Sequence, residues 1–169
     1  LESYAFTQVL NSDGTVYIDV SEVQERRQVF QPSTAYQLVD CLKGCVSASG
    51  TGASAKFGNM TVAGKTGTNS DNIGVTFAGM TGYYAGAVWI GSDYYKPLES
   101  SATGGTSAAP LWAAIMSQVH ALTDCTTERD IISGSAADFG LYPSTVCGVS
   151  GMLPTTACEN DVNGYQPNT

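Results

Sequence analysis

Lys65, Thr66, Gly67 and Thr68 form the segment whose residue types are best suited to chemistry. It brings one ammonium group and two hydroxyls together, and glycine inside a strand often marks close approach by a ligand. Alternation along a strand would place Lys65 and Gly67 on one face, with both threonines on the other. An edge strand of this kind would bind an extended peptide ending in a carboxylate by strand addition. The alternative is an ordinary glycine-rich strand whose lysine reaches into solvent.

Three short strands are expected to position this motif. Runs of β-prone residues bounded by turn residues predict strands over 60–68, 75–80 and 85–90. Connections this short favour an antiparallel meander. The last strand contains Val88-Trp89-Ile90, an apolar run that predicts burial on both faces of the sheet.

A hairpin and a helix are predicted ahead of these strands, which makes the expected fold α+β, an antiparallel sheet packed with two main helices. Asp13-Gly14 lies between two β-prone runs and predicts an N-terminal hairpin over 5–18. Apolar residues at helical spacing predict a helix after Pro32, capped by Ser33 and ending near 47–52.

A second helix is predicted to begin near Ser107, with Pro110 tolerated in its first turn. The apolar stripe expected to face the core consists of Leu111, Ile115, Val119 and Leu122, with Trp112 beside it. The chain then becomes rich in turn residues. We therefore expect one domain portion over 1–122 and an appended tail over 123–169.

Charge excludes several classes of partner. Seven basic and fifteen acidic residues give a net charge of -8, and the basic residues are scattered. Nucleic-acid binding needs clustered Lys or Arg, and an anionic membrane surface needs the same, so neither partner is predicted. No apolar run approaches the ~20 residues that span a bilayer. The chain opens on Leu1 rather than Met, and we expect it to be cut from a longer protein.

The five cysteines lack Cys-x-x-Cys spacing, and with a single histidine they predict neither a metal site nor a cofactor. Cys147 and Cys158 flank a turn-rich loop and suit a disulfide. Cys41 and Cys45 lie one helical turn apart and are either bridged or merely packed. An oxidising compartment is favoured. His120 is expected at the surface or as a partner of the helix dipole, rather than as a catalytic base.

The order of several motifs resembles one protein family. It is similar to the C-terminal part of the transpeptidase domain of bifunctional, high-molecular-mass (class A) penicillin-binding proteins. The matching segments are Gly50–Gly52, Ala63–Thr68, Phe77–Gly79, Val88–Gly91, Thr103–Gly105 and Ala108–Trp112. A stretch from Val146 to Cys158 also resembles a short tail that often follows this domain. The resemblance covers the chain from about Phe6 to Cys158.

This resemblance implies an enzyme that cross-links peptidoglycan outside the bacterial membrane to which the full-length protein is anchored. In such enzymes a serine is acylated by the penultimate D-Ala of a stem peptide, and an amine of a neighbouring stem resolves the acyl-enzyme. Penicillins acylate the same serine. The implied partners are therefore stem peptides, β-lactams and the missing N-terminal part of the same protein, with no nucleic acid and no membrane contact by this segment.

The resemblance also implies roles for single residues. Lys65 would help to hold the substrate carboxylate through its charge and would take part in the proton network. The hydroxyls of Thr66 and Thr68 would bind the terminal carboxylate of D-Ala-D-Ala or of a β-lactam. The backbone N–H of Thr68 would supply half of the oxyanion hole, and Gly67 would let the substrate backbone lie close.

Three departures from the family pattern limit what this chain can do. No Ser-x-x-Lys occurs in it, so the nucleophile is absent and the chain alone is predicted to be inactive. Ser70-Asp71-Asn72 spells Ser-x-Asn, but it follows Lys65 and lies in a predicted turn, where such residues have local backbone roles. Gly74 stands where the family usually has an Asp.

Two other functions stay open at this stage. A D,D-carboxypeptidase or serine β-lactamase fragment would share Lys-Thr-Gly, and a glycosyltransferase domain upstream would exclude both. A secreted, disulfide-bearing module could use the same strand to bind peptides without catalysis. A catalytic serine upstream in the same gene would argue against that module.

Overall fold

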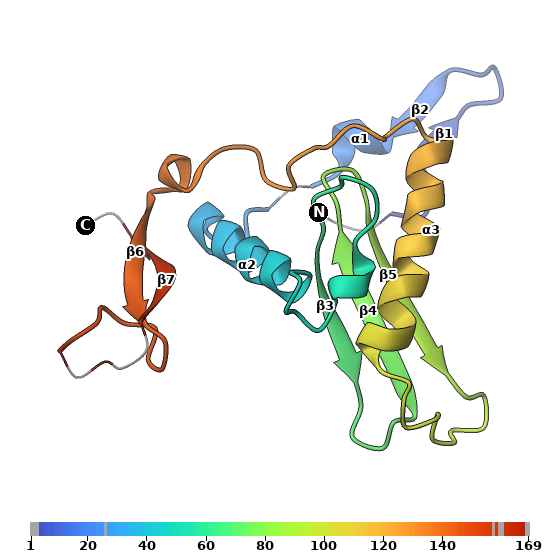
Figure 1. Cartoon of the computed structure of the whole chain (residues 1–169). Helices are drawn as coiled ribbons and strands as arrows, with labels where there is room; N and C mark the ends of the chain where they lie inside the picture. The colour runs from blue at the N-terminus through green and yellow to red at the C-terminus, as the bar shows by residue number, and fades with distance from the viewer. Residues whose placement is uncertain (1–3, 26, 157, 159–160, 168–169) are drawn as a thin grey trace. The chain divides into compact units, whose positions relative to one another are not determined.

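The computed structural model describes residues 4–25, 27–156, 158 and 161–167 of the chain. The chain divides into two compact units, Leu1–Gln31 and Pro32–Thr169 (Figure 1). The larger unit contains every residue predicted to take part in the site.

The smaller unit is a hairpin followed by one helical turn. Strands β1 (Gln8–Leu10) and β2 (Val16–Asp19) pair antiparallel, and α1 covers Val20–Val23. In the turn, Asp13 Oδ1 accepts the backbone N–H of Thr15 at 3.0 Å, and Gly14 takes a φ of 84°. A φ in this left-handed region suits glycine. The predicted hairpin is therefore confirmed.

The larger unit is built on the predicted three-stranded meander. Strands β3 (Ala63–Thr68), β4 (Gly74–Met80) and β5 (Ala85–Gly91) pair antiparallel in the order β3-β4-β5. Thr66 pairs with Phe77, which in turn pairs with Val88. Among the described strands, β3 is thus an edge strand, as binding by strand addition requires.

Helix α2 (Pro32–Cys45) contacts β3 and begins one residue before the predicted cap. Pro32 is the first helical residue, where proline is tolerated because its missing N–H would have no partner within the helix. Ser33 therefore lies inside the first turn rather than at the predicted cap position. The chain then runs through a short 3-10 turn, η1 (Ala53–Ala55), on its way to β3.

Helix α3 (Ala109–Leu122) continues from a π-helical turn, η2 (Gly104–Ala108), and packs on one face of the sheet (Figure 1). The stripe predicted to face the core is wrong: Leu111, Ile115 and Leu122 are 44%, 46% and 86% exposed. The buried stripe instead consists of Ala109, Trp112, Ala113, Met116 and His120.

Glycines on the sheet decide which stripe of α3 is buried. A Cβ on Gly79 would lie 3.0 Å from the Trp112 ring, and the indole N–H donates to the carbonyl of Gly86 at 2.9 Å. Phe77 meets the same indole edge-on, with ring centroids 5.2 Å apart. Trp112 therefore fills the space over Gly79 and Gly86, the strand positions that have no side chain.

The opposite face of the sheet is open within the described part of the chain. Trp89 is 62% exposed there, so the prediction that this strand is covered on both faces is wrong for this chain. Only the alternate residues Val88 and Ile90 pack against the core.

The C-terminal segment forms a second hairpin. A 3-10 turn, η3 (Ala136–Phe139), leads into β6 (Leu141–Cys147), which pairs antiparallel with β7 (Asp161–Pro167). The sequence patterns predict only a turn-rich tail for this segment, because apolar and polar residues do not alternate clearly along its strands. The division of the chain at residue 122 stays a prediction.

The predicted disulfides are not formed, since each of the five cysteines is a free thiol. Cys41 is exposed, whereas Cys45 turns to the Thr51 hydroxyl, with 3.4 Å between Sγ and Oγ1. Cys158 Sγ accepts the backbone N–H of Thr155 at 3.3 Å. Cys45 and Cys158 thus each have a polar partner outside their predicted pair.

Candidate functional site

A groove of about 520 Å³ lies beside β3. Six of its nine lining residues carry a hydroxyl: Thr51, Ser54, Thr66, Thr68, Thr103 and Thr106. The other three are small residues, Gly50, Ala53 and Gly105. None of these nine described residues is charged, so the lining offers hydrogen bonds rather than charge.

Strand β3 forms one wall. Thr66 and Thr68 both line the groove, as alternation along the strand predicts. Lys65 does not line it: its ammonium folds back onto the carbonyl of Thr66 at 2.9 Å. Gly67 has a packing reason to be glycine, because a Cβ there would lie 2.3 Å from Thr76 Oγ1.

The Gly-Thr-Gly segment after α2 forms a second wall. A Cβ on Gly50 would lie 2.0 Å from the carbonyl oxygen of Cys45, and the N–H of Gly52 donates to that oxygen at 2.9 Å. These glycines hold the segment tightly against the helix end. The hydroxyl of Thr51 is thereby placed 2.8 Å from that of Thr66.

The Gly-Gly segment of η2 closes the groove. The N–H of Gly104 donates to Thr68 Oγ1 at 3.0 Å, and a Cβ on Gly104 would lie 2.8 Å from the carbonyl oxygen of Gly67. A Cβ on Gly105 would lie 2.2 Å from the carbonyl oxygen of Thr51. Only a chain without side chains at these two positions can lie this close to both walls.

The hydroxyls of the groove differ in how much hydrogen-bonding capacity remains. Thr106 Oγ1 donates to the carbonyl of Ser101 at 2.8 Å and accepts the N–H of Thr103 at 2.9 Å. Thr103 Oγ1 in turn accepts the N–H of Thr106, which closes a capping box at the start of η2. Thr68 Oγ1 accepts one bond, from the N–H of Gly104, and donates to none of the described residues, so its hydrogen remains available.

The edge of β3 also offers backbone donors. Asn69 N–H donates to Gly74 O at 3.3 Å, which shows that residues of this parity direct their N–H groups at β4. The N–H groups of Thr66 and Thr68 therefore point away from β4. The first interacts with the sulfur of Cys45. The second is directed at the open edge, where a carbonyl oxygen of a ligand can accept it.

Cys45 lies behind this wall in a polar environment. Burial opposes ionisation of its thiol, but hydrogen bonds from the Thr51 hydroxyl and the Thr66 backbone, with the charge of Lys65, lower its pKa below the ordinary value. Sequence reasoning missed Cys45 and Thr51 as site residues. The Gly-Thr-Gly triplet was the available signal, because glycines on both sides of a threonine predict close backbone packing.

Two other sequence candidates lie away from the groove. Asn72 sits in the β3–β4 turn with a φ of 51°, and its side-chain amide donates to the carbonyl of Glu99 at 2.7 Å. His120 is 2% exposed, so the prediction that it lies at the surface is wrong. Its ring is held between the Thr81 hydroxyl and the Cys125 carbonyl.

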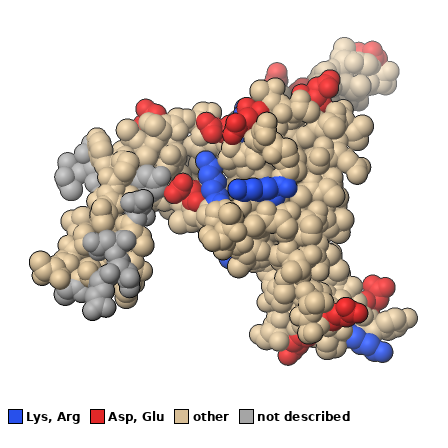
Figure 2. All heavy atoms as spheres, viewed as in Figure 1, with Lys and Arg blue, Asp and Glu red and all other residues tan. Residues whose placement is uncertain are grey.

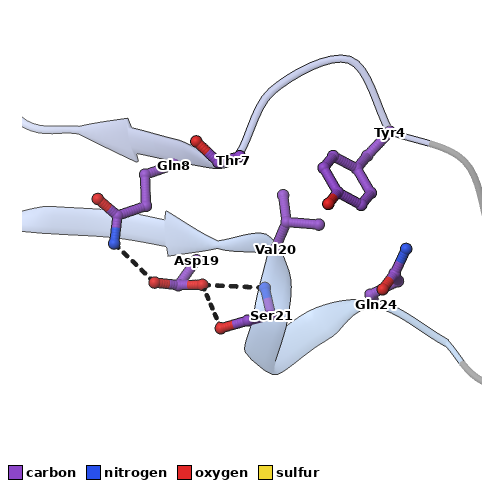
Figure 3. A pocket seen from close by; sticks show the side chains of 7 residues that line it. All are labelled: Tyr4, Thr7, Gln8, Asp19, Val20, Ser21 and Gln24. Atoms are coloured by element: carbon purple, nitrogen blue, oxygen red, sulfur yellow. Dashed lines mark hydrogen bonds between the residues drawn. The ribbon is translucent and has the colours of Figure 1, made fainter. Parts of the chain in front are cut away.

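The smaller unit has a pocket of its own, shown in Figure 3. Asp19 accepts hydrogen bonds there from the Gln8 side-chain amide at 2.7 Å and from the backbone N–H of Ser21 at 2.9 Å. These bonds lower the pKa of Asp19. The carboxylate of Asp19 thus caps a single helical turn. We infer no reactive role for it in this pocket.

Charge and metal chemistry add little to the site. On the face seen in Figure 2, the Lys and Arg side chains near the centre have Asp and Glu close by, and no broad basic patch forms. Within residues 4–25, 27–156, 158 and 161–167, no group of three or more His, Cys, Asp or Glu side chains could hold a metal ion. None of the helices described is both long and apolar enough to cross a membrane.

Comparisons with known proteins agree with this architecture. Residues 3–117 match the family model of the penicillin binding protein transpeptidase domain. Penicillin-binding protein 1A of Clostridium perfringens is 38% identical over 160 residues, which cover 94% of this chain and 18% of that protein. The homologue of Clostridium botulinum is 37% identical over 163 residues, covering 96% of this chain and 18% of that protein.

Among solved structures, penicillin-binding protein 1A from Haemophilus influenzae superposes with a TM-score of 0.63. The match covers 97% of this chain and 28% of that one, at 15% sequence identity, and so shows the fold. The family match and the superposed fold together define a part of an α+β transpeptidase domain. The chain belongs to the penicillin-binding protein transpeptidase family and corresponds to the C-terminal part of a class A domain. It spans about a fifth of the length of these curated relatives.

Proposed function

We propose that this chain supplies the carboxylate-binding wall of a peptidoglycan D,D-transpeptidase. The observation that carries the proposal is the groove itself, in which Thr66 and Thr68 share one face of an edge strand and face further hydroxyls. A carboxylate accepts several hydrogen bonds at once, and bonds to a charged acceptor are the strong ones. The terminal carboxylate of a D-Ala-D-Ala stem peptide, or that of a β-lactam, is the ligand that suits this wall.

The edge of β3 supplies the second element of the proposal. The ligand would lie along β3, with Thr68 N–H donating to the carbonyl under attack as one of the two oxyanion donors. Gly67 would allow its close approach. Lys65, on the other face of the strand, would act through its charge and the proton network rather than as a lining residue of the groove.

The nucleophile would come from outside this chain. The sequence contains no Ser-x-x-Lys, so the serine that is acylated and the lysine that serves it would lie in another part of the protein. The full protein would be membrane-anchored and act on the outer side of that membrane. This chain alone would form no acyl-enzyme.

Two measurements on the 169-residue chain test the proposal. An acetylated L-Lys-D-Ala-D-Ala peptide and its C-terminal amide would be titrated into the labelled protein and followed by NMR. We expect the free acid to bind more tightly and to shift the amides of Thr66 and Thr68. Equal binding of acid and amide would contradict the proposal, and so would covalent labelling of this chain by a fluorescent penicillin.

A further inference from the structure

Thr51 and Cys45 form a hydrogen-bonded chain that ends on the Thr66 hydroxyl. Cys45 Sγ lies 3.4 Å from Thr51 Oγ1, which lies 2.8 Å from Thr66 Oγ1. A hydroxyl has one hydrogen and two lone pairs, so the direction of this chain decides what Thr66 offers to the groove. If Thr51 donates to Thr66, the Thr66 hydrogen is free. If Thr66 donates to Thr51, only lone pairs face the ligand.

The protonation state of Cys45 selects the direction. A neutral thiol has a hydrogen that it can give to Thr51. Thr51 then accepts from the thiol and donates its own hydrogen to Thr66. A carboxylate in the groove would strengthen the same direction, because it accepts the Thr66 hydrogen at the far end of the chain.

We propose that Thr51 is a positioning residue which, with Cys45 behind it, aims the hydrogen of the Thr66 hydroxyl at the carboxylate of the ligand. The inference rests on the proposed function of the groove. It assigns different tasks to the hydroxyls of the groove. Thr66 and Thr68 bind the anion, Thr51 orients the first of them, and Thr103 and Thr106 satisfy each other at the start of η2.

The ligand arm of the test uses the acid and amide forms of acetylated L-Lys-D-Ala-D-Ala. Thr51→Val keeps the shape but removes the hydroxyl, and Thr51→Ser restores it. We expect the preference for acid over amide to fall about tenfold in the valine variant, as for loss of a hydrogen bond to a charged group, and to return in the serine variant. Thr61→Val is the matched control, because Thr61 bonds to Glu128 and does not line the groove.

A second arm needs no ligand. The rate at which iodoacetamide alkylates Cys45 would be followed against pH, with Cys41 as the internal reference. Trypsin cuts after Lys43 and separates the two cysteines for mass spectrometry. Ionisation would reverse the chain, because the thiolate accepts the Thr51 hydrogen. We expect the midpoint for Cys45 to rise in Thr51→Val, which removes that bond, to rise by less in Thr66→Val, and to return toward the original value in Thr51→Ser.

The outcomes separate the two proposals. A wild-type chain that binds acid and amide equally overturns the proposed function, and the positioning role falls with it. If the wild-type chain prefers the acid and the Thr51→Val variant shows the same preference, the positioning role alone is overturned. An unchanged Cys45 midpoint in Thr51→Val also overturns it, because the hydrogen-bonded chain would then not exist.

Discussion

The imidazole of His120 is fixed by the hydroxyl of Thr81, with 3.1 Å between Nε2 and Oγ1. Thr81 Oγ1 also accepts the backbone N–H groups of Tyr83 and Tyr84, each at 3.2 Å, so its single hydrogen is left for the histidine. Nε2 is therefore the acceptor, and Nδ1 carries the proton that it donates to the Cys125 carbonyl at 2.6 Å. This network ties α3 to the β4–β5 turn and to the chain beyond the helix.

Removing the Thr81 hydroxyl should therefore be costly. Thr81→Val leaves two turn N–H groups and the imidazole nitrogen without their partner in a buried position, and we expect it to lower the free energy of unfolding by about 2–3 kcal/mol. Thr81→Ser keeps the hydroxyl and should lose about 1 kcal/mol. Urea denaturation followed by tryptophan fluorescence measures both. Equal stability of the two variants would contradict the network.

Two glycine-to-alanine changes should have opposite effects. In Gly104→Ala the new Cβ would lie 2.6 Å from Thr76 O and 2.9 Å from Gly67 N, backbone atoms that cannot move cheaply. We expect a loss of about 2 kcal/mol or more, together with NMR shifts at Thr68.

Gly44→Ala is the matched control, because nothing lies within 4 Å of its Cβ position and it belongs to α2. Alanine there should add up to about 1 kcal/mol through its higher helix propensity. Thermal or urea unfolding of the pair distinguishes close packing at Gly104 from a general effect of the substitution.

The buried stripe of α3 can be tested by cavity formation. Met116 is 5% exposed and belongs to the core, so Met116→Ala should cost about 2–4 kcal/mol. Ile115 is 46% exposed, and Ile115→Ala should cost less than about 1 kcal/mol in this chain. The reverse order in urea denaturation would support the stripe predicted from hydrophobic spacing and contradict the observed one.

Cys147 gives the C-terminal hairpin a pH dependence. Hydrogen bonds from the Ser150 hydroxyl, the backbone N–H groups of Ser150 and Val149 and the Cys158 thiol lower the pKa of Cys147 to about 7. The folded-state pKa is thus below that of an unfolded cysteine, ~8.5, so the thiolate stabilises the hairpin at high pH. This contribution should be lost as pH falls through about 7.

The cysteine Cβ chemical shift should report that titration. We expect Ser150→Ala to move the midpoint of Cys147 upward, because the hydroxyl that favours the thiolate is gone. Cys147→Ser should remove the pH dependence of hairpin stability over the same range. A Cys147 midpoint at the ordinary cysteine value in the unaltered chain would contradict the hydrogen-bonding arrangement.

The sequence by itself determined the N-terminal hairpin, the meander and the family. Asp13-Gly14 predicts its hairpin, short turns predict the β3-β4-β5 meander, and the alternation of Thr66 and Thr68 predicts their shared face. These features depend on neighbouring residues along the chain, so local patterns suffice for them. The motif order from Gly-Thr-Gly to Ala-Ala-Pro likewise indicates the transpeptidase family, which the match over residues 3–117 confirms.

Only the tertiary structure decided how these elements meet. Thr51 reaches a hydroxyl 15 residues away, and Gly104 N–H reaches Thr68 across 36 residues. Helix α3 has two apolar stripes, and the space over Gly79 and Gly86 selects the one with Trp112. Such contacts depend on volumes and unpaired hydrogen bonds that arise when the parts pack together, and no periodicity in the sequence contains that information.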